Sequence, residues 1–510
     1  MGLIDRLVSI LDWTAARWWR VALVVGLAAL LVTWFIQLFL LGVLFPHWSD
    51  GEGLIRGHDA SRFHQRAVEQ AQLINEYGWG AWELRPGGWS VAGVLSAWYA
   101  LTLPAPWIWA PVQSLMFGLG GALLFVVLHE VTESRRIAAI AALAVLALPS
   151  AAILYAFPHR DIFIFLGLML AIFGWSRLAA MQGEPWPLSL WLALWGSTAV
   201  LAGYLLAWVS RTFAAEIFQG LAGIVFILLS LFAVVHLARR RPLYVGTLAS
   251  PVIALALLAA MYAWHAGGEF GRHLATADTS LVQSTELRQE SGPASGAGQI
   301  SETEPEKFSA VARKPLADQW HRVGWLPHAI DDRLRRLAGA RDRFIVVSGH
   351  GRTALDIDVS FRSAQEMLEY LPRALQIGLF SPFVHQWLPS ADAPVHRNVE
   401  RVIVGAEMVF LYPILAFLLF AIWRWARRPV FWLALVPALS WILVYALTVP
   451  VVGALVRYRY AAYVVILALA LAGLLAAISD LQRRLKARRR RLDGEPIETG
   501  PTGTAARHAS

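Results

Sequence analysis

The segment Pro46–Trp89, PHWSDGEGLIRGHDASRFHQRAVEQAQLINEYGWGAWELRPGGW, is the first long polar stretch of the chain and directly follows an apolar one. Within it, apolar residues recur at helical spacing with charged residues between them, namely Phe63, Ala67, Ala71 and Ile74. This pattern predicts an amphipathic helix over Ser61–Tyr77 that lies along a membrane surface and does not cross the bilayer. Together with the acidic loop before it and the Pro/Gly turn after it, the helix forms one wall of a site at the membrane face.

The composition of the chain excludes a soluble protein. Its 510 residues are 57% hydrophobic, and the mean hydropathy is +0.53, which predicts a polytopic membrane protein. The formal charge of +9 does not indicate a nucleic-acid partner, because most basic clusters flank apolar segments, where positive-inside sorting places them. There are no cysteines, so disulfides and thiol chemistry are excluded.

Apolar segments of about 20 residues, the length that crosses a bilayer, recur along the chain. The expected spans are 21–44, 107–129, 137–156, 161–178, 188–209, 217–237, 244–264, 402–423, 430–449 and 458–479. The N-terminal sequence is amphipathic and runs into the first span without a small-residue cleavage site, so we expect a retained helix. The apolar segment Trp89–Trp109 is short and contains Pro104 and Pro106. We therefore expect it to dip into the membrane or to form the first part of a bent helix.

Basic residues orient these spans. If Trp89–Trp109 does not cross, every basic cluster falls on one side, namely Arg135–Arg136, Arg239–Arg241, Arg427–Arg428 and the tail from Arg483. That side is the cytoplasm by the positive-inside rule. We therefore expect about ten spans, both termini in the cytoplasm and the Pro46–Trp89 segment outside. A composition heavy in Ala, Arg, Trp and Leu is typical of a GC-rich bacterium, which indicates the bacterial inner membrane.

Shifts in composition divide the chain into four parts. They are an N-terminal transmembrane module (1–264) whose first outer loop (45–106) carries the expected site, an outer segment (265–401), C-terminal transmembrane helices (402–479) and a disordered basic tail (480–510). The Ser-, Thr- and Gly-rich part of the outer segment, Thr276–Pro315, is expected to be flexible. A small α+β cap is expected after it, with helices over Asp318–Asp342 and Ser363–Phe380 and a strand over Arg343–Ser348.

Sequence signatures of familiar enzymes are absent. We find no phosphate-binding loop ending in GK[ST], no HExxH, no GxSxG and no dinucleotide fingerprint. The histidines and acids between residues 47 and 64 lack the spacing of a metal site. The glycines of SGHGRT (Ser348–Thr353) have the wrong spacing for a nucleotide loop and are interpreted as a turn.

Two carboxylates, Asp59 and Asp161, lie far apart in the sequence but at the same membrane face in the expected topology. Each also fits the start of a helix, where a carboxylate caps backbone N–H groups. Arg457 and Arg459 flank the outer start of the last span, against the positive-inside trend, which favours an anion-binding role. Arg211 lies in a tight outer turn, where it is expected to pair with Glu216.

These positions resemble the GT-C superfamily of glycosyltransferases that use polyprenyl-phosphate-linked sugars, such as the protein mannosyltransferases and the lipid A aminoarabinose transferases. The family's acidic motif, aromatic residue, surface helix, basic-proline element and second acid correspond here to Asp59, Phe63, Ala67, Arg85-Pro86 and Asp161. The stretches Tyr370–Phe383 and Val456–Tyr460 resemble uncharacterised bacterial relatives from polysaccharide gene clusters. His58-Asp59 replaces the usual acidic pair and Arg-Pro-Gly replaces Lys-Pro-Pro, which leaves the donor and any metal requirement open.

The resemblance implies a GT-C-like fold and an enzyme of cell-envelope or exopolysaccharide assembly. It would transfer a sugar from a polyprenyl-phosphate-linked donor to an extracytoplasmic glycan, lipid or protein. The catalytic candidates are Asp59 and Asp161, because the attacking hydroxyl needs a carboxylate to orient and deprotonate it. Basic side chains form strong charge-assisted hydrogen bonds with phosphate. The residues expected to contact the donor phosphate are Arg85, His159, Arg160, Arg457 and Arg459. Glu52 and His58 are accessory candidates; no cofactor is assigned, and a divalent cation stays open.

Other functions remain open from the sequence alone. A polymerase of the O-antigen type also acts on polyprenyl-linked glycans at the outer face, with its key arginines in large later loops. A flippase or transporter of lipid-linked glycans should carry ionisable residues at mid-membrane and an inverted repeat, whereas the expected spans are almost free of mid-helix charge. A non-catalytic scaffold predicts that Asp59→Asn leaves glycan output unchanged.

Overall fold

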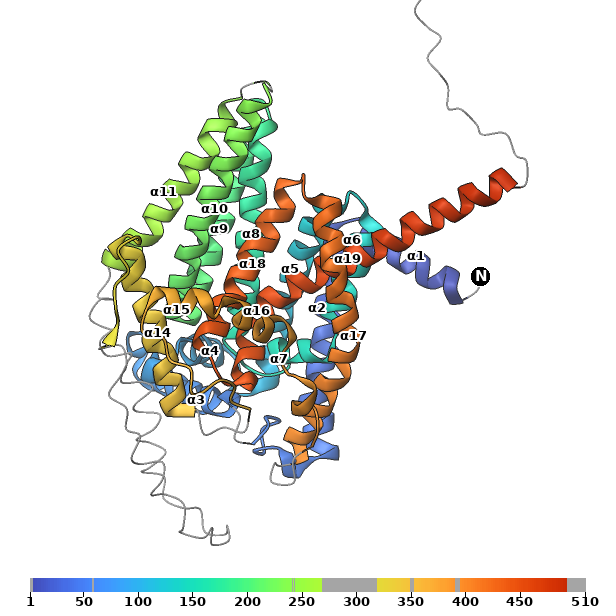
Figure 1. Cartoon of the computed structure of the whole chain (residues 1–510). Coiled ribbons are helices and arrows are strands. Elements are labelled where there is room, and N and C mark those ends of the chain that lie inside the picture. The colour runs from blue at the N-terminus through green and yellow to red at the C-terminus, as the bar shows by residue number, and fades with distance from the viewer. Residues whose placement is uncertain are drawn as a thin grey trace, which may run out of the picture.

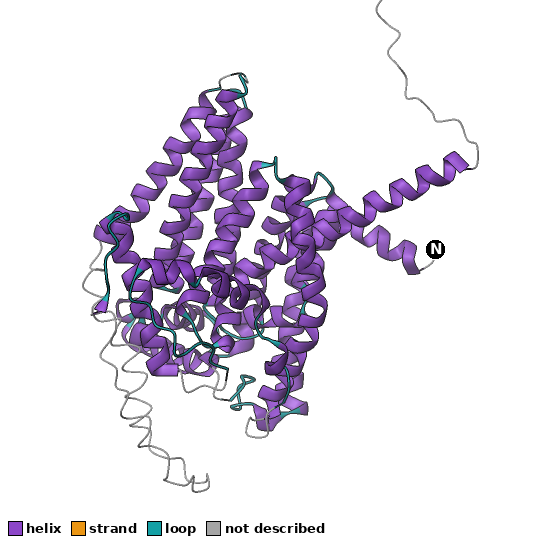
Figure 2. Ribbon diagram, viewed as in Figure 1, coloured by secondary structure: helices purple, strands orange, loops and turns teal. Residues whose placement is uncertain are grey.

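The computed structural model of the protein describes residues 3–56, 59–240, 242, 244–267, 319–348, 353–389 and 395–492. Helices dominate these ranges, and β pairing within them occurs only as isolated bridges (Figure 2). The prediction of an all-α polytopic membrane protein is confirmed.

Nine helices in the described ranges are long and apolar enough to cross a bilayer. They are α2 with η1 (Trp18–Trp34 and Phe35–Leu44), α5 (Pro106–Thr132), α8 (Asp161–Ala180), α9 (Leu188–Ser210), α10 (Thr212–Ala238), α11 (Val245–Gly267), α17 (Val395–Trp425), α18 (Pro429–Thr448) and α19 (Val452–Leu492). The prediction of a continuous span over 137–156 is wrong. That stretch is broken into α6 (Arg135–Leu146), η5 (Pro149–Ala151) and α7 (Ala152–Tyr155), because Pro149 lacks the N–H that a continuing helix needs.

The short apolar segment after the first outer loop does not cross. It forms α4 (Ser90–Leu101), and the chain then turns before Pro106 begins α5. At 1.5 Å per residue, a helix of 12 residues reaches about 18 Å, well short of the ~30 Å hydrocarbon core. The helix is therefore too short to span the bilayer by itself, as expected from the prolines that follow it.

The predicted surface helix is α3 (Asp59–Tyr77), which packs against α4. The apolar residues that predicted it, Phe63, Ala67, Ala71 and Ile74, are all buried, while Arg62, Gln65, Arg66 and Glu69 are exposed. Phe63 meets Trp89 edge to face at 5.6 Å. Burial of this stripe fixes the rotation of α3 and so the place of its first residue, Asp59.

Helix α8 lies at the centre of the bundle, in contact with α5, α9, α18 and α19 (Figure 1). Its close approach to α9 depends on small residues, since a Cβ on Gly203 would collide with the carbonyl oxygen of Gly167. Small residues at helix crossings are typical of membrane proteins, because they let backbones pack tightly. This packing buries Asp161 at the start of α8.

The outer segment contributes helices and not the predicted α+β cap. α14 (His328–Ser348) includes Arg343–Ser348, so the predicted strand is wrong. No partner strand is described beside this stretch, and its backbone groups are satisfied within the helix instead. The helix predicted over Asp318–Asp342 begins only at His328, after Pro327. The helix predicted over Ser363–Phe380 forms as α15 (Ala364–Glu369) and α16 (Leu371–Phe380), and the Ser363 hydroxyl caps it. The stretch Thr276–Pro315 lies outside the described residues.

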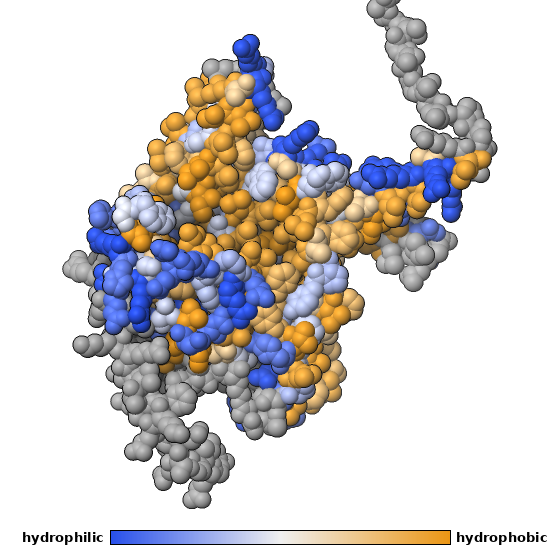
Figure 3. Space-filling view, in the orientation of Figure 1, coloured by the Kyte–Doolittle hydropathy of each residue, from blue (hydrophilic) through white to orange (hydrophobic). Residues whose placement is uncertain are grey.

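These helices, α14, α15 and α16, are called the cap below. The cap is joined to the connection between α18 and α19, because the N–H of Leu355 donates to the carbonyl of Pro450 and that of Val452 to Thr353. Figure 3 shows hydrophilic residues over the cap and along the projecting end of α19, with a broad apolar surface between them. α1 (Leu3–Ala15) and α19 both pack on α6, so the two helices nearest the chain ends lie on one side of the bundle. Of the predicted tail, residues 480–492 are the end of α19 and not disordered, and the rest lies outside the described residues.

Candidate functional site

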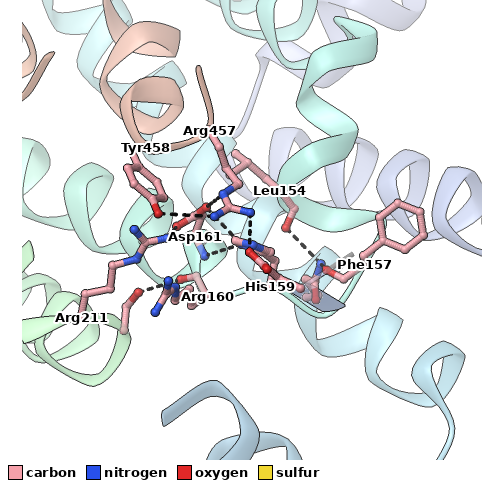
Figure 4. A network of polar contacts seen from close by, with 11 residues as sticks. Leu154, Phe157, His159, Arg160, Asp161, Arg211, Arg457 and Tyr458 are labelled. Atoms are coloured by element: carbon pink, nitrogen blue, oxygen red, sulfur yellow. Dashed lines mark hydrogen bonds and ion pairs between the residues drawn. The ribbon is translucent and has the colours of Figure 1, made fainter. Parts of the chain in front are cut away.

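Arg457 joins the two acids that are far apart in the sequence. Asp59 is the first residue of α3, Asp161 is the first residue of α8, and Arg457 lies near the start of α19. Figure 4 shows Asp161 and Arg457 next to each other. Nη1 of Arg457 lies 2.8 Å from Oδ2 of Asp59, and its Nε lies 3.4 Å from Oδ2 of Asp161. The structure therefore brings both predicted acids to one end of the helix bundle.

Asp161 is a fully enclosed carboxylate with several partners. Its side chain is 3% exposed, and Oδ1 accepts a hydrogen bond from Nη2 of Arg211 at 2.8 Å. Nδ1 of His159 lies 3.0 Å from Oδ2, the oxygen that also faces Arg457. A buried charge is tolerated when paired and hydrogen-bonded, and the N-terminus of α8 adds favourable backbone dipoles.

Asp59 differs from Asp161 in exposure and in the number of its partners. Its side chain is 41% exposed, and among the described residues Arg457 is its only ion-pair partner. Partial burial raises the pKa of Asp59, but the charge and hydrogen bond of Arg457 outweigh it and lower the pKa to about 2. Asp59 is therefore ionised at neutral pH and accessible to a ligand.

Arginine side chains outnumber the carboxylates around Asp59 and Asp161. Arg211 lies with Cζ 3.9 Å from the ring centroid of Tyr458, and Arg457 lies 5.2 Å from the same centroid. Arg160 lies 5.8 Å from the ring centroid of Phe63 and forms no ion pair within the described ranges. Burial and the charge of Arg211 lower the pKa of Arg160 to about 10, which leaves it protonated at neutral pH.

His159 does not add to this positive charge. Burial lowers its pKa to about 4, even though Asp161 beside it acts in the opposite direction. Arg160, Arg211 and Arg457 therefore face Asp59 and Asp161 with one positive charge in excess. An excess guanidinium in a half-buried site suits an anion with several acceptor oxygens, such as a phosphate.

Arg85 and Arg459, which were predicted to contact the phosphate, make hydrogen bonds with backbone carbonyls elsewhere in the structure. Arg85 donates to the carbonyl of Trp208 at 2.8 Å and stacks on its ring, which anchors the turn before α4 to the last turn of α9. Arg459 is 1% exposed and donates to the backbone carbonyls of Ile377, Gly378 and Ser381 at the end of α16. The structure therefore places Arg459 under the cap and not beside Asp161.

The accessory candidates do not join the two acids either. Glu52 lies 2.6 Å from Nε2 of His64, whose Nδ1 lies 2.8 Å from the hydroxyl of Tyr99. These contacts tie the first outer loop to α3 and α4. His58 lies outside the described residues. In the part of the chain that the structure describes, no three His, Cys, Asp or Glu side chains form a group that could hold a metal ion.

Arg211 and Tyr458 were missed as members of this site. Arg211 was expected to pair with Glu216, but it pairs with Asp161, and Glu216 lies 4.0 Å from His265 instead. A signal was present in the sequence: Arg211 is a basic residue at the outer end of a span, against the positive-inside trend that singled out Arg457. Tyr458 carried no comparable signal, because aromatic residues are common at membrane boundaries.

The chain was also compared with known proteins. Comparisons with protein-family models, with curated protein sequences and with solved structures gave no match in any of the three.

Proposed function

We propose that the protein is an integral membrane glycosyltransferase of the GT-C type. It transfers a sugar from a polyprenyl-phosphate-linked donor to a hydroxyl of an extracytoplasmic acceptor during cell-envelope or exopolysaccharide assembly. The observation that carries this proposal is the convergence of Asp59 and Asp161 on Arg457, beside the guanidinium groups of Arg160 and Arg211. A base and an anion site are thereby adjacent at one end of a membrane-spanning bundle.

The arginines suit the leaving group. When the bond between the sugar C1 and the phosphate oxygen breaks, the electron pair stays on the phosphate, and polyprenyl phosphate leaves as an anion. Arg160 and Arg211 are held by Phe63, Tyr458 and Asp161 before any ligand binds, so they stabilise this charge without reorganisation. Their planar forks match the phosphate oxygens.

The two acids have different roles in this reaction. Asp59 is accessible, so it accepts the proton of the acceptor hydroxyl while the oxygen of that hydroxyl bonds to the sugar C1. Asp161 is enclosed and held by Arg211, His159 and Arg457. It acts as the fixed counter-ion that orients the arginines. This division follows from burial, since a carboxylate without room for a hydroxyl cannot deprotonate one.

The membrane setting favours a lipid donor. The acids and Arg457 lie at the starts of α3, α8 and α19, at the end of the bundle that the cap covers. The basic connections after α5, α10 and α17 lie at the other end (Figure 1), and by the positive-inside rule they face the cytoplasm. The site then faces the periplasm or exterior of a bacterial inner membrane, where a polyprenyl-linked sugar reaches it from the lipid.

The test is a profile of lipid-linked intermediates in a deletion strain. Complementation with wild type or with Glu69→Gln, an exposed residue of α3, should restore the glycan. Complementation with Asp59→Asn should instead accumulate unprocessed polyprenyl-phosphate sugar. A normal profile in the Asp59→Asn strain would overturn the proposal. Accumulation of lipid-linked repeat units would indicate a polymerase, and donor retained in the inner leaflet would indicate a flippase.

A further inference from the structure

We propose that the donor phosphate opens the ion pair between Arg457 and Asp59, so that donor binding releases the carboxylate that acts as the base. This inference rests on the proposed function and concerns how the site becomes active. In the structure Nη1 of Arg457 donates a hydrogen bond to Oδ2 of the accessible Asp59 carboxylate at 2.8 Å. An engaged carboxylate is a weak proton acceptor, so the pair must open before catalysis.

An incoming anion is drawn first to Arg160. Arg160 has no carboxylate within ion-pair distance among the described residues, and it lies beside Arg211 and Arg457 (Figure 4). A phosphate attracted to Arg160 therefore also meets two cations that already hold carboxylates. Because a phosphate group presents several acceptor oxygens, it competes for those cations.

The two ion pairs of Arg457, with Asp161 and with Asp59, differ in how easily a phosphate can break them. Asp161 is 3% exposed, so water could not replace a lost partner there, and breaking a buried ion pair is strongly unfavourable. Asp59 is 41% exposed, so water can replace Arg457 around it, and solvent screens the attraction between the two groups. The pair with Asp59 is therefore the one that a phosphate breaks.

Arg457 contacts the two acids through different nitrogen atoms of its guanidinium group. Its Nε, close to the aliphatic stem, faces Asp161, whereas Nη1 at the tip reaches Asp59. The tip can turn to a phosphate while Nε stays on Asp161. Asp161 keeps Arg211 and His159 throughout. Arg457 can therefore bind the donor phosphate while the contacts of the buried Asp161 stay in place.

Two properties of Asp59 follow from the release. Its pKa, held at about 2 by Arg457, rises toward the ordinary value of 3.8 once the guanidinium has moved. The carboxylate then accepts a hydrogen bond from the acceptor. The binding order is donor first and acceptor second.

The experiment uses the full-length protein in lipid nanodiscs and farnesyl phosphate, a short prenyl phosphate without sugar, titrated by calorimetry. If the phosphate competes with Asp59 for Arg457, Asp59→Asn should bind farnesyl phosphate at least about threefold more tightly than wild type. Asp59→Ser, which keeps a helix-capping oxygen, should give the same gain. Glu69→Gln on the same helix should bind as wild type does.

An Arg457→Gln background separates competition from long-range attraction. Loss of a negative charge raises anion affinity through space in any background, whereas competition for Arg457 needs Arg457. We therefore expect the gain from Asp59→Asn to vanish when Arg457→Gln is also present. A gain that persists there, or equal affinities of wild type, Asp59→Asn and Asp59→Ser, would overturn the inference and leave the proposed function standing. Failure of wild type to bind farnesyl phosphate would overturn both.

Discussion

Arg211 stacks on Tyr458, with its Cζ 3.9 Å from the ring centroid, and the same guanidinium donates to Asp161 at 2.8 Å. Arg211 belongs to the turn between α9 and α10, and Tyr458 belongs to α19. The ring thereby joins two distant parts of the chain above the buried carboxylate. It holds Arg211 and Arg457 on one side of Asp161, where the candidate site needs them.

Tyr458 should act through its ring more than through its hydroxyl. Cation–π contacts contribute about 0.5–2 kcal/mol, depending on burial, and the hydroxyl makes only a marginal contact of 3.5 Å with Nη2 of Arg457. Tyr458→Phe should therefore keep sugar transfer within about threefold of wild type, whereas Tyr458→Leu should lower it about tenfold or more. Transfer assays on the two purified variants check this. Equal losses would contradict a role of the ring.

The two acids should differ in their effect on stability. Asp161→Asn removes the charge that compensates Arg211 in a closed site, and we expect a loss of about 3–5 kcal/mol. Asp59→Asn breaks a half-exposed pair and should cost at most about 1 kcal/mol. Unfolding of both variants in the same detergent measures the difference. Equal destabilisation would contradict the assignment of Asp161 as the buried counter-ion.

Arg457 and Arg459 should separate binding from folding. Arg459 holds three backbone carbonyls at the end of α16, so Arg459→Gln should lower stability and leave the affinity for farnesyl phosphate unchanged. Arg457→Gln should weaken that affinity by about tenfold or more, since a charge-assisted bidentate contact is lost. Calorimetry and thermal unfolding of both variants provide the comparison. If Arg459→Gln weakened the affinity for farnesyl phosphate, the result would indicate that Arg459 contacts the phosphate.

His159 should make stability depend on pH. Its pKa is lowered by burial from 6.5 to about 4, so between these values the unfolded chain binds a proton that the folded chain does not. Stability is therefore lost as the pH falls from 6.5 toward 4, by at most about 3 kcal/mol. His159→Asn, which does not titrate and keeps a side-chain acceptor for the backbone N–H of Asp161, should flatten this slope. Exposed His47→Gln is the control and should keep it. An unchanged slope in His159→Asn would show that other groups cause the loss.

Arg341 should fasten the cap. It is 1% exposed and donates to the carbonyls of Asp356, Val359 and Leu447, which joins the segment 353–361 to the end of α18. Because three buried carbonyls lose their donor, Arg341→Ala should speed hydrogen exchange over 353–361 by about tenfold or more. Arg322→Ala removes a more exposed pair with Asp332 and should not change that exchange. Protection equal to wild type in Arg341→Ala would assign the docking to other contacts.

Several features of the fold were predictable because they depend on composition along one element. The apolar length of nine of the ten predicted spans, the stripe of α3 from Phe63 to Ile74 and the break at Pro104 and Pro106 are local properties, and the structure agrees with them. Where the prediction was wrong, a neighbour was needed to decide. Arg343–Ser348 has strand-like residues but no partner strand in the described chain, so it completes α14. The packing between helices that accommodates the break at Pro149 could not be predicted from the sequence either.

By itself, the sequence determined that this is a multi-span helical membrane protein, because hydropathy is read residue by residue. Only the tertiary structure decided the partners of the charged side chains. It brought Arg457 to both acids, added Arg211 and Tyr458, and turned Arg459 to the cap. The physical reason is that a charge within an apolar segment must find its counter-charge across helices, and the rotation of each helix is set by packing that one sequence does not display.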